Sequence, residues 1–144
     1  MLAAVFLGPW LGCLVISLVF IVQCFLFQDG GVAVLGANIL NMAVIGTGLG
    51  YLVFALGKNV WPTRQGYLAS VALGSWLSVM ASAAACAFEI GISGTYPTGL
   101  TLKAMLSVHA LIGIGEAVIT GFIVTTMLVL RSDLVTTYPA ELKS

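Results

Sequence analysis

Residues 9–27 read PWLGCLVISLVFIVQCFLF, a run without a single charged side chain. A helix needs about 20 apolar residues to cross the hydrocarbon core of a bilayer. Proline is favoured at the first position of a helix, so Pro9 marks a natural start. Residues 30–57 and 65–88 are also free of charge and long enough to span. These runs together predict an all-α, polytopic transmembrane helix bundle.

The composition supports a bilayer rather than water as the solvent of this chain. Of 144 residues, 60% are hydrophobic and 7% are charged, and the mean hydropathy is +1.15. Soluble domains are about one quarter charged. Five basic residues balance five acidic ones, so no net charge attracts nucleic acid. We therefore expect the lipid bilayer, and no nucleic acid, as a partner.

Turn residues divide the chain into four membrane segments that follow a short amino-terminal stub. The glycines of FQDGG favour a turn after the first span. The last apolar stretch is too long for one straight span, so we expect GIG at 113–115 to bend it, or a short re-entrant helix to precede the main span. The stub covers 2–8, and the spans cover 9–27, 35–57, 65–91 and 100–130.

The basic residues predict the orientation of the bundle. An even number of crossings separates Lys58 and Arg64 from Arg131 and Lys143, and excess Lys and Arg marks the cytoplasmic side. The carboxyl terminus and the polar tail 136–144 should then be cytoplasmic. The Asp29 loop and the Ser93–Gly99 loop should lie outside. Lys103 is the exception, because a long lysine near an interface can extend its amine to water.

Small residues recur at helical spacing in two of the predicted spans. Gly46 and Gly50 form one such pair, and Ala81 and Ala85 form another. Small residues let helix backbones approach closely in lipid. Ala81 and Ala85 are also candidates for a surface that docks a partner protein. The three cysteines form no C-x-x-C pair and are expected to be packing residues; they are Cys13, Cys24 and Cys86.

A few polar residues inside the apolar runs are candidates for a substrate cavity. Asn38 and Asn41 share a helix face, where they either bond neighbouring helices and the adjacent loop or line a polar cavity open to the outside. His109 and Glu116 share a second face, about 10 Å apart along the axis. Ionisable groups at this depth are functional candidates. The structural alternatives are a neutral imidazole bonded to a backbone carbonyl and a carboxylate that fixes the bend. Glu89, near the outer end of its helix, is expected to be solvated.

The sequence contains no constellation typical of catalysis. It has one histidine, and the motifs of zinc proteases, serine hydrolases and phosphate-binding loops are absent. An enzyme is therefore not expected.

Several blocks of the sequence resemble the CbiM/NikM family of cobalt and nickel transport subunits. They are LAAVFLGPWLG, VQCFLFQDGGVAVLGANILNMAVIG, GYLVFAL, MLSVHALIGIGEAVIT and RSDLV, in that order. The resemblance implies a bundle of about seven helices, of which residues 1–135 would be the carboxyl-terminal transmembrane part. It also implies capture of Co²⁺ or Ni²⁺ at the plasma membrane. A transmembrane coupling subunit and cytoplasmic ATPase subunits would then drive release inward.

The chain departs from this family at the metal-binding amino terminus. The family begins with Met-His, whose nitrogens chelate the metal, whereas this chain begins Met1-Leu2. The metal ligands are therefore unassigned, with His109 as the one histidine available. The resemblance therefore implies a carboxyl-terminal portion, which is a split gene product, the result of a mis-called start or an incomplete sequence. A separate amino-terminal, metal-chelating polypeptide is a candidate partner. Two alternatives are a structural fragment that needs such a partner and a specificity subunit for a small organic metabolite.

Overall fold

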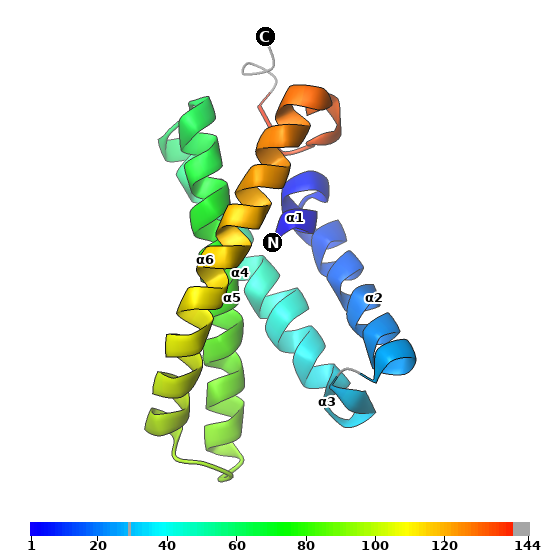
Figure 1. Ribbon diagram of the computed structural model, residues 1–144, viewed down its shortest axis with the longest axis vertical. Helices are drawn as coiled ribbons and strands as arrows, with labels where there is room; N and C mark the ends of the chain where they lie inside the picture. Colours follow the sequence, from blue (N-terminus) through cyan, green and yellow to red (C-terminus); the bar gives the residue numbers. More distant parts are fainter. Residues whose placement is uncertain (29, 140–144) are drawn as a thin grey trace.

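The computed structural model describes residues 1–28 and 30–139 and contains helices but no strands within them. The expectations for Asp29, for Lys143 and for most of the polar tail lie outside the described residues. The elements are α1 (Leu2–Leu7), α2 (Pro9–Phe27), α3 (Gly31–Asn38), the π-helix η1 (Ile39–Gly46), α4 (Thr47–Val60), α5 (Arg64–Ile92), α6 (Thr98–Leu130) and the 3₁₀ turn η2 (Ser132–Leu134) (Figure 1).

The predicted all-α membrane bundle is confirmed. Within the described residues, four helices are long and apolar enough to cross a membrane; they are Pro9–Phe27, Gly31–Val60, Arg64–Ile92 and Thr98–Leu130. The second of these is the continuous path of α3, η1 and α4. The predicted stub forms the short helix α1, which ends at Gly8 before Pro9 starts α2.

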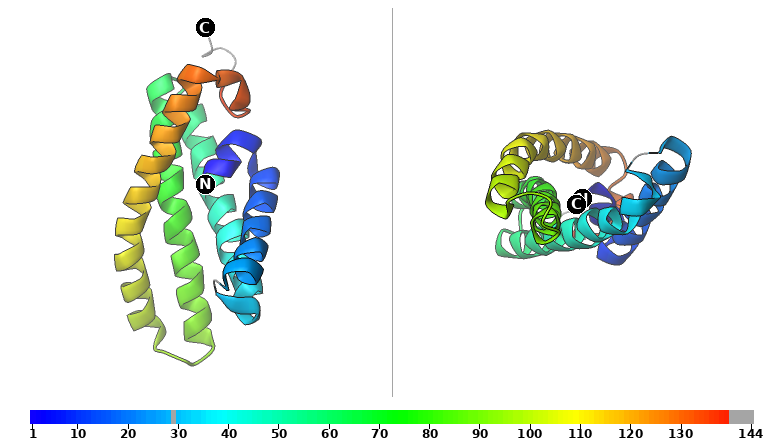
Figure 2. Two further views of the ribbon diagram at one scale, coloured as in Figure 1. Left: turned by 45° about the vertical axis from the view of Figure 1, so that its right-hand side comes forward. Right: turned by 90° about the horizontal axis from the view of Figure 1, so that it is seen from below.

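The two carboxyl-terminal helices form one long antiparallel pair, and the η1–α4 path packs against α5. Helices α5 and α6 lie side by side, the path from α3 to α4 crosses them at a slant, and α2 lies on the far side (Figures 1 and 2). We call the end with the link between α4 and α5 the α4–α5 end. The opposite end, with the α5–α6 loop and the α2–α3 link, is the α5–α6 end.

The second span starts earlier than predicted. Its expected start was Leu35, but helix begins at Gly31 because the reversal after α2 is very tight. Gln28, Gly30 and Gly31 have φ of 55°, 75° and 68°, a region that glycine enters without steric penalty. The turn signal in the sequence was correct, and the chain needs no further residues before it becomes helical.

The same span also contains a π-helical segment that the sequence did not indicate. Two hydroxyl groups support its wide turns. Thr47 Oγ1 donates to Met42 O at 3.1 Å, and Ser82 Oγ of α5 donates to Asn41 O at 2.9 Å. π-helical segments are rare and are often found at functional sites. This one places Asn41 and Gly46 against α5.

The last span is one unbroken α-helix, so the expected re-entrant helix is wrong and the helix does not break at residues 113–115. Helix α6 has 33 residues and is about 50 Å long at 1.5 Å per residue. It exceeds the roughly 30 Å hydrocarbon core and runs obliquely across α5 (Figure 1). Glycine keeps its N–H donor, so an isolated glycine weakens a helix without ending it.

Gly113 serves close packing between α5 and α6. A Cβ atom at Gly113 would lie 2.9 Å from Trp76 Cδ1, and the Trp76 indole N–H donates to Ala110 O at 3.1 Å. The indole ring therefore lies against the bare backbone of α6. This contact gives Gly113 a packing role at the α5–α6 interface.

Gly113→Ala is expected to destabilise the bundle by about 1–2 kcal/mol, because the new methyl group must displace the Trp76 ring. Gly115→Ala is the matched control, since a Cβ there meets no atom within 4 Å. Unfolding in mixed micelles on titration with SDS measures both variants. Equal midpoints would show that Gly113 is not a packing glycine.

Small residues of α5 and of the η1–α4 path interlock along the interface between these helices. Gly46 lies against Ser82, Gly50 against Gly74 and Ser78, and Gly57 against Ser70. A Cβ at Gly50 would lie 2.7 Å from Gly74 O. The predicted Gly46 and Gly50 pair thus contacts α5. Ser70, Gly74, Ser78 and Ser82 recur every fourth residue, which places them on one helix face.

The segment after α6 folds back onto the end of α1. Thr136 N and Oγ1 donate to Phe6 O at 3.2 and 2.6 Å, and Thr137 Oγ1 donates to Val5 O at 2.6 Å. These bonds satisfy carbonyls that a helix end otherwise leaves without intrahelical partners. Val135 is fully buried and Tyr138 is nearly so. The first residues of the predicted polar tail are therefore part of the packed structure.

Candidate functional site

Asn41 and Glu89 form a hydrogen bond between two helices near the α5–α6 end. Asn41 Nδ2 donates to Glu89 Oε2 at 2.8 Å, which joins η1 to α5. In this contact the amide nitrogen is the donor and the carboxylate oxygen is the acceptor. Glu89 lies one turn before the end of α5 and is half-buried. The expectation that Glu89 is merely solvated is therefore wrong, since the carboxylate has a specific partner across the interface.

The other end of the Asn41 amide has no partner. Asn41 is 4% exposed, and its Oδ1 is fully buried without a hydrogen bond in the described structure. Such groups are few in native structures, and each calls for an explanation. The backbone carbonyl of Asn41, by contrast, accepts from Ser82 Oγ. Of the sequence candidates, Asn41 is thus the one whose surroundings are polar, buried and incompletely satisfied.

Asn38 lies in the same span but contacts the α2–α3 link. A Cβ atom at Gly30 would lie 2.6 Å from Asn38 Nδ2, so the amide packs directly on the Gly30 backbone. The contact agrees with the structural alternative, in which Asn38 stabilises the loop. Its role in a substrate cavity stays a prediction.

His109 and Glu116 lie on α6 with separate partners. His109 Nδ1 lies 2.8 Å from Met105 O, so this nitrogen carries a proton and donates to the preceding helical turn. This contact with a backbone carbonyl is the one expected if His109 has a structural role. Glu116 Oε1 lies 3.4 Å from the Met1 amino group, with 38% of its side chain exposed. Its role in fixing a bend stays a prediction.

The sequence candidates therefore do not converge on one site. Asn41 contacts Glu89, whereas Asn38, His109 and Glu116 each have a different neighbour. Across residues 1–28 and 30–139, no three His, Cys, Asp or Glu side chains are grouped so that they could hold a metal ion.

Ala81 and Ala85 are half-buried on α5, next to the fully buried Ala83 and Ala87. Their role as a docking surface stays a prediction. The cysteines are free thiols in the described structure, with Cys24 buried and the other two half-buried. This state agrees with the expectation of packing residues without disulfides.

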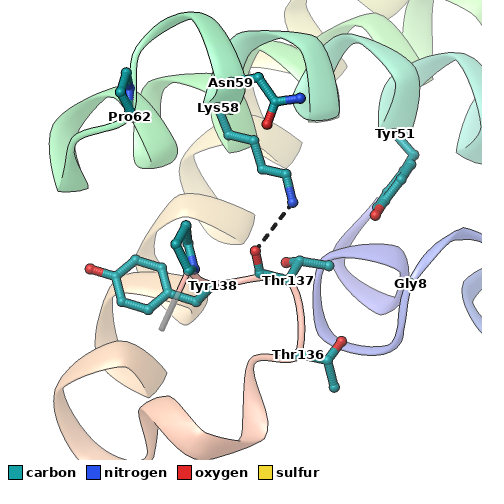
Figure 3. Close-up of a pocket in the computed structure, with 9 residues that line it drawn as sticks. Gly8, Tyr51, Lys58, Asn59, Pro62, Thr136, Thr137 and Tyr138 are labelled. Atoms are coloured by element: carbon teal, nitrogen blue, oxygen red, sulfur yellow. Dashed lines mark hydrogen bonds between the residues drawn. The ribbon is translucent and has the colours of Figure 1, made fainter. Parts of the chain in front are cut away.

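A cavity of about 650 Å³ lies at the α4–α5 end, away from Asn41 and Glu89 (Figure 3). Lys58 points into it and donates to Thr137 O at 3.3 Å, while its amine lies 5.2 Å from the centre of the Phe54 ring. The lining residues are largely polar and come mostly from α4 and the carboxyl-terminal segment, together with Gly8 and Pro62. None of the candidates from the sequence lines this cavity.

Arg131 adds a fixed positive charge at the same end of the bundle. Its guanidinium donates to both carboxylate oxygens of Asp133, at 2.9 and 2.8 Å. This contact raises the pKa of Arg131 above its ordinary value. Both side chains are exposed, and such surface pairs contribute little to stability.

Comparison with known proteins places the chain in a transport family. Residues 1–134 match the family model "CbiM: Cobalt uptake substrate-specific transmembrane region". The "Putative fused nickel transport protein NikMN" of Archaeoglobus fulgidus is 35% identical over 93% of this chain and 44% of its own length. The "Cobalt transport protein CbiM" of Sorangium cellulosum is 30% identical over 92% of this chain and 60% of its own length.

A solved structure has the same fold. The crystal structure of a transition metal transporter superposes with a TM-score of 0.84 at 32% identity, covering 91% of this chain and 63% of that one. The chain thus spans between 44% and 63% of the length of these three proteins. Because the family model covers nearly the whole sequence, the resemblance seen in the sequence is confirmed, and the chain belongs to the CbiM family of cobalt uptake substrate-specific transmembrane regions.

Proposed function

We propose that this chain is a membrane component for the uptake of Co²⁺ or Ni²⁺. The observation that carries the proposal is the match of residues 1–134 to a cobalt uptake family model, supported by the fold shared with a transition metal transporter. The relatives are transporters, which agrees with the expectation that the chain is not an enzyme.

The proposed orientation puts the α4–α5 end in the cytoplasm of the cell that imports the metal. Lys58, Arg64 and Arg131 lie at this end, and positive charge favours the cytoplasmic side of the plasma membrane. The α5–α6 end, with Asn41 and Glu89 near it, then faces the outside. Cargo would enter from that side.

We further propose that the chelating ligands that first capture the metal come from polypeptide beyond this chain. The described residues contain no group of three ligating side chains, and the relatives are longer than the matched region. The chain would supply the packed helical body against which a metal-chelating amino-terminal part is held. By the family resemblance, a coupling subunit and ATPase subunits complete the transporter.

The test is uptake of radioactive ⁵⁷Co²⁺ or ⁶³Ni²⁺ by bacteria that lack their own transporters for both metals. Cells carry the metal-chelating polypeptide, the coupling subunit and the ATPases, with or without this chain. We expect at least tenfold more cell-associated metal when the chain is present, because the other parts lack the helical body. A second control carries all parts with an inactive ATPase. If cells that carry the chain take up neither metal above the level of both controls, the proposal is contradicted.

A further inference from the structure

We propose that Asn41 and Glu89 form an oxygen-ligand site for a divalent cation near the α5–α6 end of the bundle. Two groups carry the inference, namely the Glu89 carboxylate and the buried Asn41 Oδ1 that has no hydrogen-bond partner. The further statement that the bound cation is cargo on its way inward rests on the proposed function. Binding itself does not.

The orientation of the Asn41 amide leaves an oxygen that needs an electropositive partner. Because Nδ2 donates to Glu89, Oδ1 is the end without a partner. A buried amide oxygen without a partner destabilises a protein by about 1–3 kcal/mol. A cation bound between Oδ1 and the carboxylate would satisfy this oxygen.

The chemistry of these two groups favours a divalent metal ion. Carboxylates and amide carbonyls are hard oxygen ligands of the kind that bind Mg²⁺, Ca²⁺ and Mn²⁺. Two protein ligands are fewer than the roughly six or more that these ions usually take. Such a site binds loosely, which suits an ion that must move on.

The π-helix gives a structural reason for Asn41 to face α5. The single hydroxyl hydrogen of Ser82 is shared between two carbonyls, Asn41 O and Ser78 O, each 2.9 Å from Ser82 Oγ. Gly46 lies directly against Ser82, so the backbones of η1 and α5 approach closely beside Asn41 and Glu89. The cation site therefore lies between two helices that are held in place by contacts independent of Asn41 Nδ2 and Glu89.

Asn41→Asp separates cation binding from a purely structural role of the pair. Aspartate removes the N–H donor and places two carboxylates side by side, so the variant should melt at a lower temperature than wild type without metal. A cation site predicts that Mn²⁺ reverses this loss, with a melting shift at least twice that of wild type and binding at least tenfold tighter. The 144-residue chain in lipid nanodiscs is used, with Mn²⁺ binding followed by electron paramagnetic resonance.

Two further variants keep the test sharp if Asn41→Asp fails to fold. Glu89→Gln retains an oxygen that can accept from Asn41 Nδ2 but loses the charge, so Mn²⁺ binding should weaken at least tenfold without lowering the melting temperature in the absence of metal. Asn38→Asp adds the same charge to the same span and should leave Mn²⁺ binding within twofold of wild type. No saturable Mn²⁺ binding by wild type, or equal binding by wild type and Glu89→Gln, overturns the proposal.

Uptake of ⁵⁷Co²⁺ then separates this inference from the proposed function. Reduced uptake with Glu89→Gln in the complete transporter supports a cation site on the transport path. If the wild-type chain supports no uptake but still binds Mn²⁺, the transport function is contradicted and the cation site stands. Normal uptake together with unaltered Mn²⁺ binding in Glu89→Gln removes the site and leaves the transport function standing.

Discussion

Gly50→Leu is expected to destabilise the bundle by about 2–3 kcal/mol, which is the upper part of the range for overpacking. A Cβ at Gly50 would lie 2.7 Å from Gly74 O and 2.7 Å from Ser78 Cβ. A backbone carbonyl cannot rotate away as a side chain can, so α4 and α5 must separate. The separation also pulls apart the neighbouring contact of Gly57 with Ser70.

Gly48→Leu is the control for Gly50→Leu. Gly48 is exposed in the same helix, and a Cβ there meets no atom within 4 Å. Both variants gain the same helix propensity and the same apolar side chain, so their difference isolates the α4–α5 interface. Titration with SDS in mixed micelles gives both unfolding midpoints. A Gly48→Leu midpoint as low as that of Gly50→Leu would contradict the interface.

Thr137→Val is expected to lower the free energy of unfolding by about 1–2 kcal/mol. The Thr137 hydroxyl has one hydrogen, which it donates to Val5 O at 2.6 Å. Tyr67 therefore donates its own hydroxyl to Thr137 Oγ1, at 2.8 Å. Valine removes both bonds and leaves the hydroxyl of Tyr67, a residue only 1% exposed, without this partner.

Tyr67→Phe provides the double-mutant cycle for this junction. If the unpaired tyrosine hydroxyl causes part of the loss, the double variant should be less destabilised than the sum of the two single variants. Thr126→Val is the control, because Thr126 is exposed and bonds only Phe122 O of its own helix. The same SDS titration measures wild type, the two single variants, the double variant and the control. Strict additivity would show that Tyr67 does not depend on Thr137.

The junction at Thr137 shows why the polar tail could not be assigned from the sequence. Polar residues after a last span are ordinarily solvated, and nothing local in the sequence distinguishes Thr136 and Thr137. Their partners are Val5 O and Phe6 O, near the opposite end of the chain. A contact between residues so far apart becomes visible only when α1 and α6 are placed together.

Glu89 is a second residue that sequence reasoning misjudged. Its position near a helix end made solvation the simplest interpretation, and its partner Asn41 lies on another helix. One signal in the sequence could have joined them: both are polar residues in apolar spans that run antiparallel, near the same predicted face of the membrane. The depth of two residues in the membrane, however, does not reveal which faces of their helices meet.

The amino-acid sequence by itself determined that this protein is a helical membrane bundle of the CbiM family. Spans of apolar residues must form helices in lipid because each backbone group has to be satisfied within its own segment. Only the tertiary structure decided the π-helix, the unbroken course of α6 and the pairing of Asn41 with Glu89. These features depend on which helix faces touch, and the packing of small residues such as Gly50 and Gly113 sets those contacts at atomic distances.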